Sequence, residues 1–259
     1  MNKLSILKRK LKNKDPILST TISNIAWSGL IQKASAFSFD FMVFDTEHGT
    51  LSVDGLDEML RMCRFCDLPS IVRLPDCIPS VISKALDMGA DGLLVPRVES
   101  LAQVETTIRA ARYFPRGRKG CGGFSNFRND DYGNVEQYND NRLIFIQVES
   151  PEGMSVLPSI LESYGEELAG VIIGPYDSSI MLGTPLEIES DAMTNYIKKI
   201  FSICHDAGIS CGSFVDNGDM IARYRDLGGN IFWIGTEISL LCESFTNVCN
   251  AFQKEMIGF

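Results

Sequence analysis

Short apolar runs recur along the whole chain. They are rich in Ile, Val, Leu and Phe and do not alternate with polar residues, as expected for strands that are buried on both faces. Each run is too short for a long helix and is followed by a polar or glycine-containing segment. We therefore predict eight strands, near Ile17–Ser23, Phe41–Asp45, Ser70–Leu74, Gly92–Pro96, Leu143–Glu149, Gly170–Gly174, Ile209–Val215 and Asn230–Gly235.

Segments with a helical spacing of apolar residues lie between most of these strands. Several of them end at a glycine, as at Gly89, Gly208 and Gly228, which is typical of a helix C-cap that leads into the next strand. The predicted helices cover Val53–Cys66, Ile78–Met88, Leu101–Tyr113, Met154–Tyr164, Ala192–Ala207 and Met220–Leu227.

Strands that alternate with helices in one chain of 259 residues predict a (β/α)8 barrel, with residues 1–259 as a single domain. An open, doubly wound sheet is the alternative. That fold would favour a glycine fingerprint after the first strand, and none is present. The glycine-rich run Gly120-Cys-Gly-Gly123 follows a helix and Pro115, so it is a poor candidate for a dinucleotide-binding loop.

The two ends of the chain are each predicted to be helical. Residues 1–15 are basic with interspersed leucines and lack the continuous apolar region of a signal peptide, so we expect a short surface helix. No run approaches the length of a transmembrane helix, and we expect a cytoplasmic protein. Residues 237–259 carry apolar residues on one helical face, which should either cover the protein's own barrel or pack on a neighbouring chain.

Composition narrows the class of function. The formal net charge of −9 argues against a general nucleic-acid surface, and 45% apolar residues suffice for one sizeable core. Eight scattered cysteines in a chain without an export signal indicate reduced thiols. Cys63 and Cys66 have CxxC spacing, but no second pair follows at the spacing of a zinc site, so a structural role is favoured over a redox or zinc-binding one.

Polar residues collect where the predicted strands end. In a barrel, the chemistry lies at the C-terminal ends of the strands. Each of these residues taken singly has a structural explanation, such as a helix cap or an ion pair at the rim, but their joint placement at successive strand ends favours a functional site. The set comprises Asp45, Glu47 and His48 after the second strand, Arg73 after the third, Gln147 and Glu149 after the fifth, and Gly174-Pro175-Tyr176-Asp177 after the sixth.

These residue types suit chemistry on a 2-oxo acid. Glu149 and Asp177, on adjacent strands, could bind one divalent cation, and all-oxygen ligands with open water positions suit Mg²⁺ or Mn²⁺. Arg73 would add a fixed positive charge beside the ketone oxygen. His48, oriented by Asp45, would move a proton.

One connection, from Phe114 to Asp140, is long, and such loops are often functional or flexible. Arg116, Arg118 and Lys119 within it could contact the phosphates of an acyl carrier such as coenzyme A. A solvated loop or a contact between subunits is the alternative.

The chain resembles the metal-dependent class II pyruvate aldolases of the HpcH/HpaI type. The similarity extends over nearly the whole chain and includes Phe39-Asp-Phe-Met-Val-Phe-Asp-Thr-Glu-His-Gly49, Val72-Arg-Leu-Pro75, Gln147-Val-Glu149 and Gly174-Pro-Tyr-Asp177. The resemblance implies a (β/α)8 barrel of the phosphoenolpyruvate/pyruvate type. Its last helix would be exchanged between subunits of a homo-oligomer, a dimer or a trimer of dimers.

The resemblance also implies roles for individual residues. Glu149 and Asp177 would bind the metal, and His48 would act as the base, paired with Asp45. Arg73 would contact the substrate. Glu47 and Gln147 would support the metal site, and the residues matching Gln147, Gly174, Pro175 and Tyr176 would line the substrate pocket.

The chain departs from the family's pattern in its pocket. The aldolases typically carry a tryptophan in the first strand, where this chain has Leu18-Ser-Thr-Thr-Ile22, and a small residue where it has Tyr176. Three functions are therefore considered. The favoured one is a citrate synthase that condenses oxaloacetate with acetyl-CoA, as in the branch that serves siderophore biosynthesis. The second is cleavage of a 4-hydroxy-2-oxo acid to pyruvate and an aldehyde, and the third is a non-catalytic sensor of 2-oxo acids.

Overall fold

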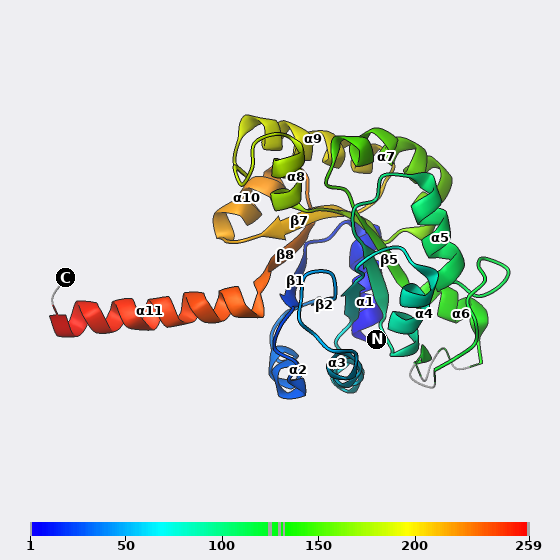
Figure 1. Cartoon of the computed structure of the whole chain (residues 1–259), viewed down its shortest axis with the longest axis horizontal. Helices are drawn as coiled ribbons and strands as arrows, with labels where there is room; N and C mark the ends of the chain where they lie inside the picture. Colours follow the sequence, from blue (N-terminus) through cyan, green and yellow to red (C-terminus); the bar gives the residue numbers. More distant parts are fainter. Residues whose placement is uncertain (1, 124–125, 129–130, 132, 258–259) are drawn as a thin grey trace.

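Eight parallel strands close into a barrel in the computed structural model, which describes residues 2–123, 126–128, 131 and 133–257 (Figure 1). Each strand pairs with its sequence neighbours, and β8 pairs with β1. The predicted (β/α)8 barrel is thus confirmed, and the open sheet is excluded. The strands are β1 Ile17–Ile22, β2 Phe41–Asp45, β3 Ser70–Arg73, β4 Gly92–Val95, β5 Leu143–Gln147, β6 Gly170–Ile173, β7 Cys211–Val215 and β8 Ile231–Thr236.

Two apolar layers stabilise the barrel. Side chains that point inward, among them Phe41, Val43, Ile71 and Phe145, fill its interior. The rings of Phe41 and Phe145 stack with their centroids 5.8 Å apart across this interior. A larger core lies between the outer faces of the strands and the helices. Because both faces are buried, the strands are apolar throughout, which is why the sequence revealed them.

The helical layer follows the predicted pattern, with three additions. Serines cap several helices through their side-chain oxygens, for example Ser52 at α3 and Ser190 at α9. The short helices α2, α6 and α8 were not predicted from the sequence. The helices are α1 Lys3–Asn13, α2 Ser28–Ala34, α3 Val53–Phe65, α4 Pro79–Asp87, α5 Leu101–Ala111, α6 Val135–Asn141, α7 Pro151–Tyr164, α8 Pro175–Met181, α9 Asp191–Asp206, α10 Gly218–Asp226 and α11 Glu237–Ile257.

The N-terminal helix α1 closes one end of the barrel. Leu4, Leu7 and Leu11 are buried in the same cluster as the inward-pointing strand residues. The Ser210 hydroxyl donates a hydrogen bond of 2.7 Å to the carbonyl of Leu11. A helix is present in the segment where one was expected, and the structure adds that the leucine stripe of this basic helix packs under the strands.

The last helix, α11, extends away from the barrel (Figure 1). Its apolar side chains are exposed; Phe245, for example, is 63% exposed. Of the two expectations for this segment, covering its own barrel is excluded for the described residues, while residues 258 and 259 lie outside them. In the described part of the chain, no helix is long and apolar enough to span a membrane.

Described residues of the long connection after α5 contact the N-terminal end of the barrel. Arg116 pairs with Glu167 and Asp140, which precede β6 and β5. The buried Lys119 pairs with Asp87 at the end of α4, and Arg118 lies over the ring of Phe114. Part of this connection, residues 124–125, 129–130 and 132, lies outside the described residues. Arg116 and Lys119 are thus at the end of the barrel opposite to the strand C-termini.

Candidate active site

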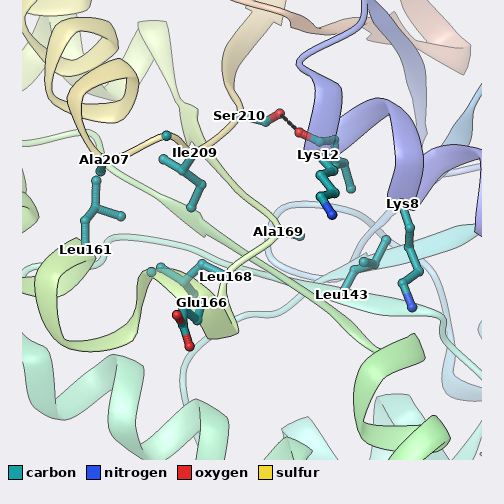
Figure 2. A pocket seen from close by; sticks show the side chains of 13 residues that line it. Lys8, Lys12, Leu143, Leu161, Glu166, Leu168, Ala169, Ala207, Ile209 and Ser210 are labelled. Atoms are coloured by element: carbon teal, nitrogen blue, oxygen red, sulfur yellow. Dashed lines mark hydrogen bonds between the residues drawn. The ribbon is translucent and has the colours of Figure 1, made fainter.

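Most of the residues predicted from the strand ends line one cavity of about 430 Å³ at the C-terminal end of the barrel, whereas Glu47 and Glu149 are not among its lining residues. A larger cavity, of about 640 Å³, lies at the opposite end beside α1 (Figure 2). No predicted site residue lines that second cavity, so the first one is the candidate active site. Its lining comprises Thr21, Ser23, Asn24, Asp45, His48, Arg73, Gln147, Gly174, Pro175, Tyr176, Asp177, Phe214, Trp233, Thr236 and Ile238.

Arg73 is held in the cavity by acids from the neighbouring strand. The register pairs Asp45 of β2 with Arg73 of β3. The guanidinium Nε and Nη2 atoms donate to the two oxygens of Asp45 at 2.9 and 2.5 Å, and Nη1 lies 3.4 Å from Glu47 Oε2. Burial alone raises the pKa of Asp45, but the hydrogen bonds and charge of Arg73 outweigh it and lower the pKa. The Asp45 carboxylate is therefore charged at neutral pH.

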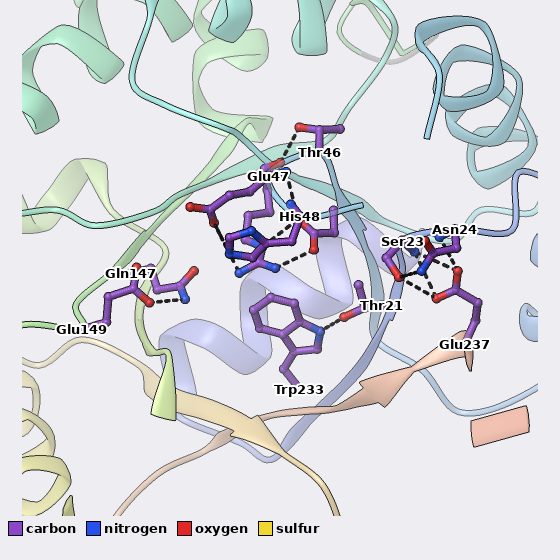
Figure 3. Close-up of polar contacts among 12 residues, drawn as sticks. Thr21, Ser23, Asn24, Thr46, Glu47, His48, Gln147, Glu149, Trp233 and Glu237 are labelled. Carbon is purple, nitrogen blue, oxygen red and sulfur yellow. Dashed lines mark hydrogen bonds and ion pairs between the residues drawn. The ribbon is translucent and has the colours of Figure 1, made fainter. Parts of the chain in front are cut away.

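His48 lies at the rim with its side chain 61% exposed. Asp45 accepts hydrogen bonds from the backbone N–H groups of Glu47 and His48, at 3.0 and 3.3 Å. The ring Nε2 of His48 lies 3.8 Å from Glu47 Oε2 (Figure 3). Asp45 therefore holds the backbone of His48, and its side-chain oxygens bind Arg73, so the expected pairing of Asp45 with the imidazole is not seen; the acid that contacts the ring is Glu47.

Glu149 and Gln147 form a buried polar pair beside β6. Gln147 Nε2 donates to Glu149 Oε2 at 2.7 Å, and the backbone N–H of Arg97 donates to Oε1 at 3.1 Å. A methyl group on Gly174 would lie 2.1 Å from Glu149 Oε2, so only glycine allows the carboxylate this position. Burial, with the nearby carboxylates of Asp177 and Glu47, raises the pKa of Glu149 to about 7.

This arrangement fits a divalent cation. Gln147 Oε1 is buried and has no hydrogen-bond partner. A cation beside Glu149 and Asp177 would satisfy such an oxygen and offset the carboxylate repulsion. Among the described residues no cluster of three or more His, Cys, Asp or Glu side chains has metal-site geometry. If Glu149 and Asp177 bind the cation, coordination positions remain for water and substrate oxygens, which suits Mg²⁺ or Mn²⁺.

The comparison with known proteins agrees with this geometry. The profile described as HpcH/HpaI aldolase/citrate lyase matches residues 23–244. The chain belongs to this family. The resemblance found in the sequence is confirmed, and an enzymatic function is supported for this HpcH/HpaI member.

Relatives in the HpcH/HpaI family differ in the reaction that their names state. The hydroxypyruvate/pyruvate aldolase of Roseovarius nubinhibens is 30% identical over 80% of both chains. The 4-hydroxy-2-oxo-heptane-1,7-dioate aldolase of Shigella flexneri is 29% identical over 84% of both chains. The structure of the citrate synthase SbnG is 26% identical, with a TM-score of 0.83 over 96% of this chain and 98% of that one. These relatives therefore leave the reaction of this member open.

An aromatic wall of the pocket was missed in the sequence. Trp233 of β8 is paired in register with Ser19 of β1, and its Nε1 donates to Thr21 Oγ1 (Figure 3). The Arg73 guanidinium lies 5.3 Å from the centre of the Trp233 ring. The first strand of this chain lacks the tryptophan that the aldolases typically carry there, and here a ring from the last strand lies beside that position. The only signal was a large aromatic residue near a strand end.

Phe214 and Tyr176 continue this wall. Phe214 meets Trp233 edge to face at 5.6 Å and lies 6.2 Å from Tyr176. The Tyr176 hydroxyl donates to Asp216, and burial, followed by the Asp216 carboxylate, raises the pKa of Tyr176 to about 12. Tyr176 therefore stays neutral and forms an apolar side of the pocket with one polar tip.

Cys63 and His205 lie apart from this site. Cys63 is fully buried in α3, where burial raises its pKa, and it is free of any disulfide. These facts fit the structural role expected of the CxxC pair. His205, the chain's second histidine, contacts the carbonyl of Gly228 with its Nε2 atom, at the end of α9. His48 is therefore the histidine available to the cavity.

Proposed function

We propose that this protein is a metal-dependent aldolase that cleaves 4-hydroxy-2-oxo acids to pyruvate and an aldehyde. The observation that carries the proposal is that His48, Arg73 and Asp177 line one cavity. Glu149 does not line this cavity, but it accepts a hydrogen bond from Gln147, which does. This set combines a base, a fixed cation and two carboxylates. A sensor of 2-oxo acids would have no need of the base.

Each residue has a distinct role in the proposed cleavage. His48 takes the proton of the C4 hydroxyl, the C3–C4 bond breaks, and the aldehyde leaves. The electron pair of that bond forms the enolate of pyruvate, whose oxygen is stabilised by the guanidinium of Arg73. Protonation of C3 then gives pyruvate. Glu149 and Asp177 would hold Mg²⁺ or Mn²⁺, which polarises the ketone when bound.

The citrate synthase remains the second candidate, because the SbnG structure is 26% identical over 96% of the chain. That function needs a site for coenzyme A. Arg116 and Lys119, which were considered for its phosphates, are engaged in ion pairs at the other end of the barrel. Arg118, the third residue considered, lies over the ring of Phe114 and does not line the cavity. These placements weaken the sequence argument for an acyl carrier, and our preference moves to the aldolase.

One experiment separates the candidates. The purified protein with Mn²⁺ is given either 4-hydroxy-2-oxoheptanedioate, with pyruvate measured by a coupled dehydrogenase, or oxaloacetate with acetyl-CoA, with free CoA measured by a thiol reagent. The aldolase predicts pyruvate release. Release of CoA without cleavage would establish the citrate synthase instead, and binding without turnover would favour the sensor.

The two histidines supply a matched control. His48→Asn should lower kcat by at least about 100-fold, because general acid–base catalysis contributes 10²- to 10⁴-fold. His205→Asn, at the end of α9 and away from the cavity, should retain full activity. Equal activity of both variants would refute the role of His48.

We also propose that α11 packs on a second copy of the chain. Ile238, Leu241, Phe245, Val248 and Phe252 are exposed at helical spacing, and a single exposed stripe of this length is unfavourable in water. The oligomer is measured by light scattering. Phe245→Asp should shift it to the monomer, whereas Glu243→Gln on the same helix should not. A wild-type monomer would refute this part of the proposal.

A further inference from the structure

The first residue of α11, Glu237, is anchored in the loop that follows β1. Its carboxylate is buried, with the residue 5% exposed. The backbone N–H groups of Ser23, Asn24 and Ile25 donate to it at 3.0, 2.5 and 2.9 Å, and the Ser23 hydroxyl donates at 3.2 Å (Figure 3). Consecutive N–H groups that converge on one carboxylate make strong, charge-assisted hydrogen bonds.

This loop is part of the cavity. Ser23 and Asn24 line it, as do Thr236 and Ile238, which flank Glu237 in the sequence. The carboxylate therefore joins two segments of the pocket that are more than 200 residues apart in the chain, as the sequence separation of 214 between Ser23 and Glu237 shows. Glu237 itself does not line the cavity, so the hydrogen bonds of its carboxylate lie behind the pocket wall.

The same loop also holds the segment that carries His48. The Thr50 hydroxyl donates to Asn24 Oδ1 at 3.1 Å, and the Thr50 N–H donates to the Ser23 carbonyl at 2.8 Å. A methyl group on Gly49 would lie 2.4 Å from that carbonyl and 2.3 Å from the carbonyl of Asp45, so the two loops are in close contact. Displacement of the Ser23 loop would therefore move the backbone on both sides of Gly49.

We propose that Glu237 is a positioning residue for His48, acting through the Ser23–Ile25 loop and Thr50. The inference rests on the proposed function, in which His48 moves the proton. Because α11 leaves the barrel directly after Glu237, this carboxylate is also the point through which the position of α11 acts on the pocket. If α11 packs on a second copy of the chain, as proposed above, that contact would help to fix the position of His48 through Glu237.

The test measures kcat and KM for cleavage of the 2-oxo acid in Glu237→Gln, Thr50→Val and the double variant. Glu237→Gln keeps the shape but removes the charge, and kcat should fall about 10-fold, as for other residues that orient a catalytic group. KM should change less than twofold, because neither residue touches the substrate. Glu243→Gln, an exposed position on α11, should match the wild type.

The double variant distinguishes positioning from a general loss of stability. If both residues act through one path, the double variant should have a kcat close to that of the lower single variant. Multiplied losses, or an unchanged kcat in folded Glu237→Gln of wild-type oligomeric state, would overturn the inference. If Glu237→Gln fails to fold, Thr50→Val alone decides, because it must lower kcat without changing the melting temperature.

A second readout needs no catalysis. Hydrogen–deuterium exchange of residues 46–50 should become faster in Glu237→Gln and stay unchanged in Glu243→Gln. Unchanged exchange would overturn the coupling even in an inactive protein. An inactive wild type with coupled exchange would instead refute the proposed function alone.

Discussion

Arg73→Lys tests the central cation of the site without removing its charge. The guanidinium spans both oxygens of Asp45, contacts Glu47 and lies over Trp233. A lysine ammonium is a point charge on a flexible stem and cannot make the two parallel bonds. The substitution should therefore leave a cation in the cavity that is no longer fixed beside the substrate's oxygen.

The expected magnitude follows from these contacts. Without the grip of Asp45, the ammonium should lose its charge-assisted hydrogen bond to the enolate oxygen that develops in the transition state, and such a bond contributes about 1.5 to 3 kcal/mol. Each 1.36 kcal/mol changes a rate tenfold. The value of kcat/KM should thus fall roughly 10- to 150-fold, with most of the loss in kcat if Arg73 acts on the developing charge.

The assay is pyruvate release at saturating Mn²⁺, with the melting temperature measured in parallel. Arg61→Lys is the matched control, because Arg61 is an exposed residue of α3 whose partner is Asp57 on the same helix. A folded Arg73→Lys variant whose kcat/KM stays within threefold of the wild type would refute the proposed role of the fixed guanidinium.

Three further predictions concern the metal, acid stability and the rim. Treatment with a chelator should abolish the activity of the wild type, and added Mn²⁺ should restore it. The Glu149→Gln variant should stay inactive when Mn²⁺ is added. Activity of the wild type in the presence of the chelator would contradict the metal site. The buried Asp91 is held by Arg128 at 2.7 Å, which lowers the pKa of Asp91 although burial raises it. Its contribution to stability is present above the unfolded pKa of about 4 and is lost as pH falls further. Asp91→Asn should therefore cost about 3 to 5 kcal/mol at pH 7 in denaturant unfolding and flatten the acid limb; an unchanged limb would contradict this. Asp216→Asn should raise kcat/KM about two- to fivefold for an anionic aldehyde in the reverse reaction, and the gain should vanish at high salt. Asp219→Asn is the control, and an equal gain with a neutral aldehyde would refute the electrostatic cause.

The strands were predictable because they are buried on both faces. Phe41–Asp45 was predicted with its observed bounds, and the others differ at their ends by one or two residues. The short helix Ser28–Ala34 was missed because it has no side-chain cap and buries only Ile31 and Ala34. The place of α1 was also missed. The sequence pattern of a leucine stripe does not show whether the stripe packs on another helix or on the open end of a barrel.

Some residues of the candidate site were likewise predictable from the sequence, and others were not. Acids, Arg73 and His48 were visible because they follow apolar runs directly, so a barrel must bring them to one end. Trp233 and Glu237 were not visible, since their importance depends on contacts with Thr21 and with the Ser23 loop, on the first strand and just after it. Closure of the barrel between its first and last strands creates these contacts, and no local pattern encodes them.

The charges around the cavity favour a substrate with one carboxylate near the ketone. Among the described lining residues, Arg73 is the only arginine or lysine, and Asp45 already binds it. A divalent cation would offset Glu149 and Asp177, but it leaves no fixed cation for a second carboxylate. Oxaloacetate carries that group two carbons from its ketone, and the lining side chains offer it neutral donors such as Ser23, Asn24 and Thr236 rather than a second cation. A protonated His48 could balance it, but that imidazole could not then act as the base. A 4-hydroxy-2-oxo acid avoids the conflict, because its far end can reach the exposed rim.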